Sequence, residues 1–220
     1  HLIDTGGPGG AETVFLTLVQ RLTPRWENVV VVPDRDWLYR SLVERGFSPV
    51  VLGARGAFDV RYLAGLVNLI RRQRVHVIQT HLFRTAVYGS LAARISGVPM
   101  VSTIHGIVDI GESSRMRNFK LGLLDRRRTR VVLVSDTLGT AVRMRRTWRH
   151  DVLRVILNGI DVAAFDTAAQ SDLRREFALP ADCVLVGAVG NVRAPKDYGN
   201  LLDAAAILRQ RSPRYRILVV

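Results

Sequence analysis

The sequence predicts an α/β fold in which a parallel sheet is covered by helices on both faces. Short runs rich in valine and isoleucine alternate with longer stretches whose apolar residues recur every three or four positions. This alternation is typical of parallel strands buried between helices. The composition agrees with a globular chain, because 48% hydrophobic and 23% charged residues exclude intrinsic disorder and a fibrous architecture.

Seven runs are candidate strands of a first sheet. In chain order they are residues 1–3, 29–32, 49–52, 75–79, 99–104, 131–134 and 153–157. Between the first two, Val14, Leu18 and Leu22 form an apolar stripe that predicts a helix lying on the sheet. Similar stripes predict helices over residues 60–72 and 85–95.

The length of 220 residues amounts to one and a half domains at roughly 150 residues per domain. The pattern breaks around residues 158–161, and we expect one domain over residues 1–165 and a second over residues 166–220. The second part holds a single strand–helix–strand unit, which buries little apolar surface alone and therefore predicts a truncated domain. Because His1 stands where a strand ends, we also expect the chain to lack its opening strand.

Composition narrows the cellular setting and the partners. A single cysteine, Cys183, excludes a disulfide framework and a multi-thiolate metal site and fits a reduced cytosolic compartment. No aliphatic run approaches the roughly 20 residues that span a bilayer, so we expect a cytoplasmic protein. The net charge of +13 indicates an anionic partner, which is a phosphate-bearing ligand, an anionic membrane surface or nucleic acid.

A glycine-rich segment, residues 6–10, lies between the first predicted strand and the helix that starts near Glu12. Glycines let the backbone approach a ligand, and the free N–H groups of a helix start favour an anion such as phosphate. The spacing is not that of the dinucleotide-binding fingerprint. A tight strand-to-helix turn without a ligand is the alternative interpretation.

Two histidines, His81 and His105, follow the fourth and fifth predicted strands. In open α/β sheets, ligands bind at the carboxyl ends of the strands, so both are candidate site residues. The alternative is that each is an ordinary loop residue. No metal-ligand cluster or nucleophile elbow accompanies them in the sequence, which leaves hydrolase and metal chemistry with little support.

Two groups of basic residues are candidate anion sites. Arg193 and Lys196 follow the first strand of the second part, where they could neutralise a diphosphate, or form an ordinary solvated loop. The tract from Arg115 to Arg154 holds twelve basic and three acidic residues, a net +9 interleaved with apolar side chains. It predicts a surface attracted to anionic lipid, or a solvated helix face, and no motif for nucleic acid accompanies it.

The order and spacing of these motifs resemble the N-terminal part of the family-4 retaining glycosyltransferases of the GT-B fold. The resemblance covers essentially the whole chain. Its carriers are the segments Gly-Gly-Pro-Gly-Gly-Ala-Glu at 6–12, Val-Ile-Gln-Thr-His at 77–81, Val-Pro-Met-Val-Ser-Thr-Ile-His-Gly at 98–106, Val-Val-Leu-Val-Ser at 131–135, Asn-Gly-Ile-Asp at 158–161 with Phe165, and Val-Gly-Ala-Val-Gly at 186–190 ending at Lys196.

The resemblance implies a GT-B-type Rossmann-like domain followed by the start of a second one. It implies transfer of a sugar, of the hexosyltransferase type, from a nucleotide-diphosphate donor to a sugar or lipid-linked acceptor, with retention of configuration and without an essential metal or cofactor. Polysaccharide or glycolipid synthesis is the implied setting, at the inner face of the membrane if the basic tract binds lipid.

The resemblance also implies roles for individual residues. Gly9 and Gly10 would contact the donor diphosphate, Lys196 would hold it, and His105 would lie near the donor sugar and acceptor. His81 is the acceptor-side candidate.

Two departures from the family pattern bear on these roles. Asn191 stands where the family often has arginine, and Arg193 lies two positions later. The family's donor-binding glutamate pair would lie beyond Val220, so we expect little transferase activity from this chain alone. The alternatives are a non-catalytic Rossmann-like binding module and a GT-B-like sugar-nucleotide epimerase.

Overall fold

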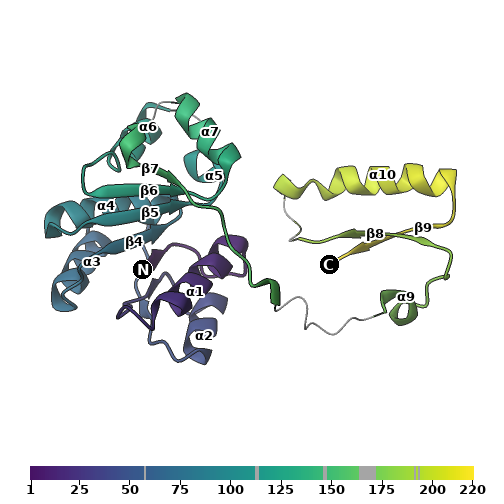
Figure 1. Cartoon of the computed structure of the whole chain (residues 1–220), viewed down its shortest axis with the longest axis horizontal. Helices are drawn as coiled ribbons and strands as arrows, with labels where there is room; N and C mark the ends of the chain where they lie inside the picture. The colour runs from purple at the N-terminus through teal and green to yellow at the C-terminus, as the bar shows by residue number, and fades with distance from the viewer. Residues whose placement is uncertain (57, 112–113, 146–147, 164–171, 191, 193) are drawn as a thin grey trace. The chain divides into compact units, whose positions relative to one another are not determined.

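The computed structural model describes residues 1–56, 58–111, 114–145, 148–163, 172–190, 192 and 194–220. The chain forms two compact units, His1–Ile160 and Asp161–Val220, each drawn in Figure 1. The division falls a few residues before the predicted boundary at 165/166, a position that lies outside the described residues.

The first unit is built on a seven-stranded, all-parallel sheet in the order β3-β2-β1-β4-β5-β6-β7, as the sequence predicts for the α/β class. Its strands are β1 (Leu2–Ile3), β2 (Val31–Val32), β3 (Val50–Val51), β4 (Ile78–His81), β5 (Met100–Ile104), β6 (Thr129–Leu133) and β7 (Leu153–Val155). Its helices are α1 (Gly10–Leu22), α2 (Trp37–Glu44), α3 (Val60–Arg72), α4 (Phe83–Ser96), α5 (Ile107–Ile110), α6 (Arg115–Gly122), α7 (Asp136–Arg145) and the 3-10 turn η1 (His150–Val152).

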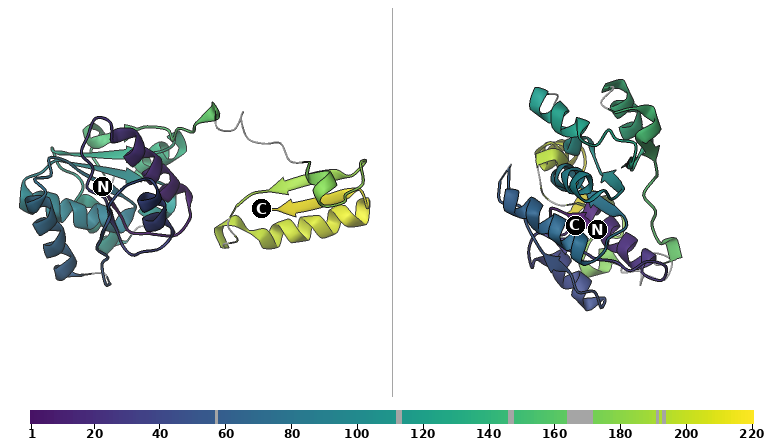
Figure 2. Two further views of the ribbon diagram at one scale, coloured as in Figure 1. Left: turned by 90° about the horizontal axis from the view of Figure 1, so that it is seen from below. Right: turned by 90° about the vertical axis from the view of Figure 1, so that its left-hand side faces the viewer.

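The strands bury side chains on both faces, because successive residues of a strand point to opposite sides. Leu2 and Val31 belong to a large core cluster that also includes side chains of α3, α4, α6 and α7. Ile3 and Val32, one residue later in each strand, belong to a second cluster with α1 and α2. Helices α3 and α4 lie side by side in the views of Figures 1 and 2.

The fourth strand is displaced from its predicted position, and the end of α3 explains why. Strand 75–79 was predicted, whereas β4 spans Ile78–His81. Arg74 has a left-handed φ of 47°, and the Val75 N–H donates to the Ile70 carbonyl at 3.0 Å. This is the Schellman arrangement that ends a helix, so Val75 closes α3 instead of starting the strand. His81 is therefore the last residue of β4, and the prediction that it follows the strand is wrong.

The second unit has the predicted strand–helix–strand order. Strands β8 (Val184–Ala188) and β9 (Tyr215–Val219) pair in parallel, with α10 (Tyr198–Arg211) between them in the chain. A short helix, α9 (Leu173–Glu176), precedes β8, and a 3-10 turn, η2 (Ala194–Lys196), precedes α10. Among the residues that the structure describes, none of these helices or those of the first unit is long and apolar enough to cross a membrane.

Candidate functional site

The parallel register of the first sheet gathers polar residues at its carboxyl edge. Ile3 of β1 pairs with His81 of β4, which pairs with Thr103 of β5. Asp4 therefore leaves the sheet beside His81, and His105 leaves it one strand further along. The structure thus brings together the two histidines that the sequence singled out.

The two imidazole rings are in direct contact. Nδ1 of His81 lies 2.9 Å from Nε2 of His105, and the rings stack with centroids 5.1 Å apart and planes 26° apart. The ring of Phe15, from α1, lies nearly perpendicular to the His81 ring, with 5.1 Å between the ring centroids. His81 is 0% exposed, and burial together with the neighbouring His105 lowers its pKa to about 3. Both histidines therefore favour the neutral form, because burial lowers the pKa of His105 as well.

The residue after His81 adopts a backbone conformation that side chains rarely take. Leu82 has φ 72° and ψ 167°, a region populated almost only by glycine. Its N–H donates to the Thr103 carbonyl at 3.2 Å, and its carbonyl accepts from Ala86 at the start of α4. The strained turn from β4 into α4 thus stands directly beside the histidine pair, as such outliers often do at functional sites.

The loop after β5 is fixed by an aspartate and an arginine. The Asp109 carboxylate accepts from the N–H groups of His105, at 2.8 Å, and Gly106, at 3.2 Å. Arg117, from α6, donates to the carbonyls of Val108, Asp109 and Ile110 at the end of α5, and its guanidinium lies 4.2 Å from the Phe83 ring centroid. Burial raises the pKa of the Asp109 carboxyl, although the two N–H groups oppose this.

Ionisation of the Asp4 carboxyl is unfavourable at this edge of the sheet. Burial raises the pKa of its carboxyl to about 6, with the Arg84 guanidinium 3.9 Å away acting in the opposite direction and Asp109 adding to the rise. A carboxyl group whose pKa is displaced this far is a common feature of functional sites. Asp4, Asp109 and the buried Glu12 together make this edge acidic.

The glycine segment serves two different purposes. A Cβ atom on Gly9 would lie 2.4 Å from the Glu12 carboxylate, so a larger residue there would displace the end of that side chain. A Cβ on Gly10, the first residue of α1, would meet nothing within 4 Å, so the space in front of it is open. The open space suits a ligand at Gly10, whereas an anion at Gly9 would lie near a carboxylate. Phosphate contacts at both glycines stay predictions.

In the second unit, Lys196 lies at the carboxyl end of β8. It ends η2, one residue before the Asp197 cap of α10, and its side chain is near Gly190. A lysine beside the start of a helix is suited to an anion, because the helix dipole and the first N–H groups add to its charge. Arg193 and Asn191 lie outside the described residues.

Sequence reasoning missed Asp4, Glu12, Asp109 and Arg117. The available signal was the position of Asp4 directly after a strand and of Asp109 four residues after His105. Within the described ranges, no group of three or more His, Cys, Asp or Glu side chains is arranged to hold a metal ion.

The raised pKa of Asp4 predicts a pH-dependent gain in stability from the Asp4→Asn substitution. The pKa of the Asp4 carboxyl is about 6 in the folded protein, above the usual 3.8, so the folded state favours the protonated group. This contribution to the free energy of unfolding is fully present below about pH 4 and is lost as the pH rises through 6. At pH 8 the variant should be more stable by about 1 to 3 kcal/mol, and at pH 4 equally stable. Urea unfolding followed by tryptophan fluorescence tests this, because Trp26, Trp37 and Trp148 all lie in the first unit.

Asp59→Asn is the matched control. The Asp59 carboxylate accepts from the N–H groups of Arg55 and Tyr62, which lower its pKa, so its contribution to stability is present at neutral pH and lost in acid. This control should never gain stability at pH 8. An Asp4→Asn variant that is no more stable than the parent at pH 8 would contradict the unfavourable ionisation of Asp4.

Comparison with known proteins places these features in a family. The model of Glycosyltransferase Family 4 matches residues 8–164. A D-inositol 3-phosphate glycosyltransferase of Thermobifida fusca is 24% identical over 96% of this chain and 55% of its own length. A UDP-Gal:alpha-D-GlcNAc-diphosphoundecaprenol alpha-1,3-galactosyltransferase of Escherichia coli is 34% identical over 64 residues, which are 29% of this chain and 16% of the relative.

Solved structures share the fold. Anabaena Alr3699/HepE in complex with UDP and glucose superposes with a TM-score of 0.80 at 21% identity, over 99% of this chain and 59% of that one. The UDP-N-acetylglucosamine 2-epimerase of Rickettsia bellii superposes with a TM-score of 0.59 at 8% identity, over 99% and 61%. The chain spans 55% of the Thermobifida relative and about three fifths of these structures. With the family model matching most of the first unit, this chain belongs to glycosyltransferase family 4, as its motif order predicts.

Proposed function

We propose that this chain is the N-terminal part of a glycosyltransferase that moves a hexosyl group from a nucleotide-diphosphate donor to an acceptor hydroxyl with retention of configuration. The observation that carries the proposal is the neutral histidine pair set among carboxylates at the carboxyl edge of the sheet. The setting we infer is polysaccharide or glycolipid synthesis.

The acidic edge of the first unit suits sugar hydroxyls better than phosphates. Carboxylates accept hydrogen bonds from hydroxyl groups, whereas they repel a diphosphate. Asp4 and Asp109 lie close together: burial raises the pKa of the Asp4 carboxyl, and the Asp109 carboxylate adds to this rise. His105 is partly accessible and favours its neutral form, so it is suited to donate a hydrogen bond to a sugar oxygen.

Lys196 is the residue that we assign to the donor diphosphate. Negative charge grows on the leaving diphosphate as the glycosidic bond breaks, and a fixed cation that stabilises this charge lowers the barrier. Lys196 is exposed beside a strand end and the start of α10. Because a lysine supplies this charge, we propose transfer without a resident metal ion, so that a chelator should leave the activity unchanged.

Relatives support a nucleotide-sugar donor and leave two classes of acceptor open. Anabaena HepE is known in complex with UDP-glucose, which favours UDP-sugars as the first donors to test. The Thermobifida relative is named for D-inositol 3-phosphate and the Escherichia coli relative for a diphosphoundecaprenol-linked sugar. A lipid-linked acceptor is the one that the basic surface described below favours.

Loss of the charge at position 196 should impair transfer. We expect Lys196→Ala, made in a longer version of the protein that spans the full length of its relatives, to slow release of the nucleoside diphosphate by about 100-fold. Arg211→Ala is the matched control, because it removes a cation from the C-terminal end of α10, whereas Lys196 lies just before the start of that helix. His105→Ala should slow turnover by a similar factor, since it removes a neutral donor. Parental rates in Lys196→Ala or His105→Ala would remove those residues from the site.

The same assay separates the alternative functions. A panel of nucleotide sugars with added sugar and lipid-linked acceptors should give nucleoside diphosphate and a glycosylated product. Interconversion of the nucleotide sugar without an acceptor product would identify an epimerase, whose fold is similar. Binding of a nucleotide sugar with no turnover in the longer protein would identify a binding module.

We also propose that helices α5, α6 and α7 form a surface that binds anionic lipid. Val108 is 76% exposed, Phe119 68% and Met144 80%, so three large apolar side chains lie on the outside of these helices. Arg145 donates to the Gly111 carbonyl at 2.6 Å, which ties the end of α7 to the end of α5. We call Ile107, Val108, Met116, Phe119 and Met144, with Arg115, Lys120 and Arg143, the α5–α7 surface.

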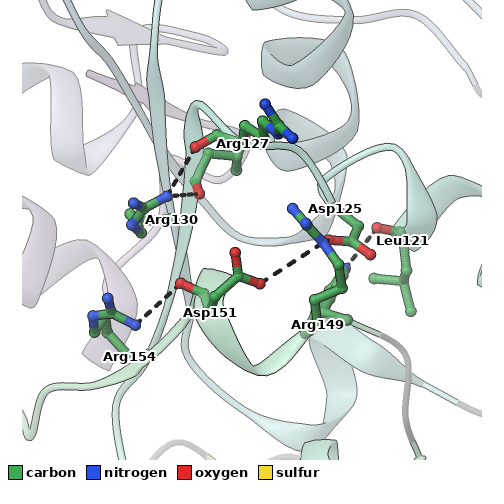
Figure 3. A network of polar contacts seen from close by, with 9 residues as sticks. Leu121, Asp125, Arg127, Arg130, Arg149, Asp151 and Arg154 are labelled. Carbon is green, nitrogen blue, oxygen red and sulfur yellow. Dashed lines mark hydrogen bonds and ion pairs between the residues drawn. The ribbon is translucent and has the colours of Figure 1, made fainter.

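Other arginines of the basic tract have structural roles, as Figure 3 shows. Arg149 pairs with Asp125 at 2.8 Å and with Asp151 at 3.7 Å. Arg130 and Arg154 donate to backbone carbonyls at the starts of β6 and β7. These arginines keep their charge, but contacts within the chain hold their side chains in place. The α5–α7 surface is the best candidate for a membrane contact because apolar and basic side chains occur there together.

Vesicle binding tests the α5–α7 surface. The chain should bind vesicles of phosphatidylcholine with phosphatidylglycerol more strongly than vesicles of phosphatidylcholine alone, and added salt should weaken the binding. Phe119→Ser combined with Met144→Ser should reduce binding to the anionic vesicles several-fold. The control, Trp26→Ser, changes another exposed aromatic residue outside this surface. Equal binding to neutral and anionic vesicles would overturn the proposal.

A further inference from the structure

The buried ring of His81 has one hydrogen-bonding nitrogen in use and one without a partner. Its Nδ1 is bonded to Nε2 of His105 at 2.9 Å. Its Nε2 is buried, and no hydrogen-bond partner for it exists among the described residues. The ring is held between Phe15 and His105, with no exposed surface, so its orientation is set by packing.

Two neutral imidazoles share one proton across such a bond, so one of two arrangements holds. If His105 donates from Nε2, the proton of His81 must sit on its own Nε2, as a buried N–H without an acceptor. If His81 donates from Nδ1, its Nε2 is an unprotonated acceptor instead. A buried donor without an acceptor is the costlier and rarer of the two. The second arrangement is therefore favoured.

This arrangement decides what His105 can do. Its Nε2 accepts the bond from His81, so in the neutral ring the remaining proton is on Nδ1. Protonation of His105 at Nε2 would place its new N–H against the Nδ1–H of His81. This clash is avoided only if the His81 proton moves to the Nε2 of His81, which has no partner among the described residues. His105 is thereby kept neutral, with its N–H on the ring side away from His81.

We propose that His81 is a positioning residue that fixes His105 in the Nδ1–H form, as a neutral hydrogen-bond donor to a substrate oxygen. The inference rests on the proposed function, in which His105 lies near the transferred sugar. In this proposal His81 acts through His105. It does not contact an acceptor directly, because its side chain is buried and has no exposed surface.

Two carboxylates near the pair act against the neutral form of His105. Asp109, from α5, and Glu12, from α1, both raise the pKa of His105 and so favour its protonation, whereas burial opposes them. On the side of His81, burial, His105 and the amino group of His1 all lower the pKa of the ring. Asp4 and Arg84 form a further pair at this edge. The bond from His81 acts with burial, against the two carboxylates.

The tautomer of His105 can be observed by nitrogen NMR of the imidazole rings in the 220-residue chain. We expect the Nδ1–H form, which free histidine disfavours, to persist between about pH 5.5 and 8. In His81→Leu, His105 should change to the Nε2–H form and its pKa should rise. His81→Asn should preserve the parental tautomer, because the asparagine amide N–H takes the place of the Nδ1–H. An Nε2–H form in the parent, or an unchanged His105 in His81→Leu, would overturn the proposal.

Turnover of the longer protein separates this inference from the function on which it rests. His81→Leu should lower kcat by about tenfold with little change in KM, and the loss should deepen in acid, whereas His81→Asn should recover most of it. If His105→Ala keeps the parental rate, the proposed function is wrong at this residue. If His105→Ala is impaired and His81→Leu is not, the positioning role of His81 is wrong.

Discussion

The pairing of β4 with β5 is the interaction on which the candidate site depends. His81 pairs with Thr103, and His105 comes two residues after Thr103, so the two rings can meet at the same edge of neighbouring strands. A shift of one residue would turn His81 to the opposite face of the sheet. The Schellman end of α3 keeps Val75 out of the strand, and β4 begins at Ile78.

Burial then determines the protonation states of the side chains at this edge. The face of β4 that carries His81 is covered by Phe15 of α1, and the same helix contributes Glu12. Low exposure keeps both imidazoles neutral and raises the pKa values of Asp4 and Asp109. The edge thus combines neutral hydrogen-bonding groups with carboxyl groups that ionise reluctantly, an arrangement that suits hydroxyl groups of a sugar.

The two units carry different kinds of polar group. The first unit holds the histidine pair and carboxyl groups at its sheet edge, and the second holds Lys196 beside the start of α10. Arg117 and Arg145 connect the lipid-binding surface that we propose to the loop that carries His105.

Much of the fold could be predicted from the sequence, because hydrophobic periodicity reports burial directly. Helix α3 was predicted with its observed bounds, and every strand of the sheet was found, although β4 was displaced since Val75 looked like a strand residue. The two histidines were predicted to meet at one edge because parallel strands end together.

The contacts of the site could not be predicted, because they depend on register and loop path. Asp109 reaches the His105 N–H only through the turn of α5, and Glu12 is recognisable only once Gly9 is seen to make room for it. The structural roles of basic side chains within the tract could not be predicted for a similar reason. Sequence counts charge, whereas the structure shows Arg130, Arg149 and Arg154 bonded to carbonyl or carboxylate groups of the chain itself.

The histidine pair is tested most directly by the scalar coupling between nitrogen atoms across its hydrogen bond. With both imidazoles labelled with nitrogen-15, a coupling between Nδ1 of His81 and Nε2 of His105 should be detected at neutral pH, because the two atoms are 2.9 Å apart and share a proton. The observation of both resonances with no coupling between them would contradict the paired, neutral histidines on which the site is built.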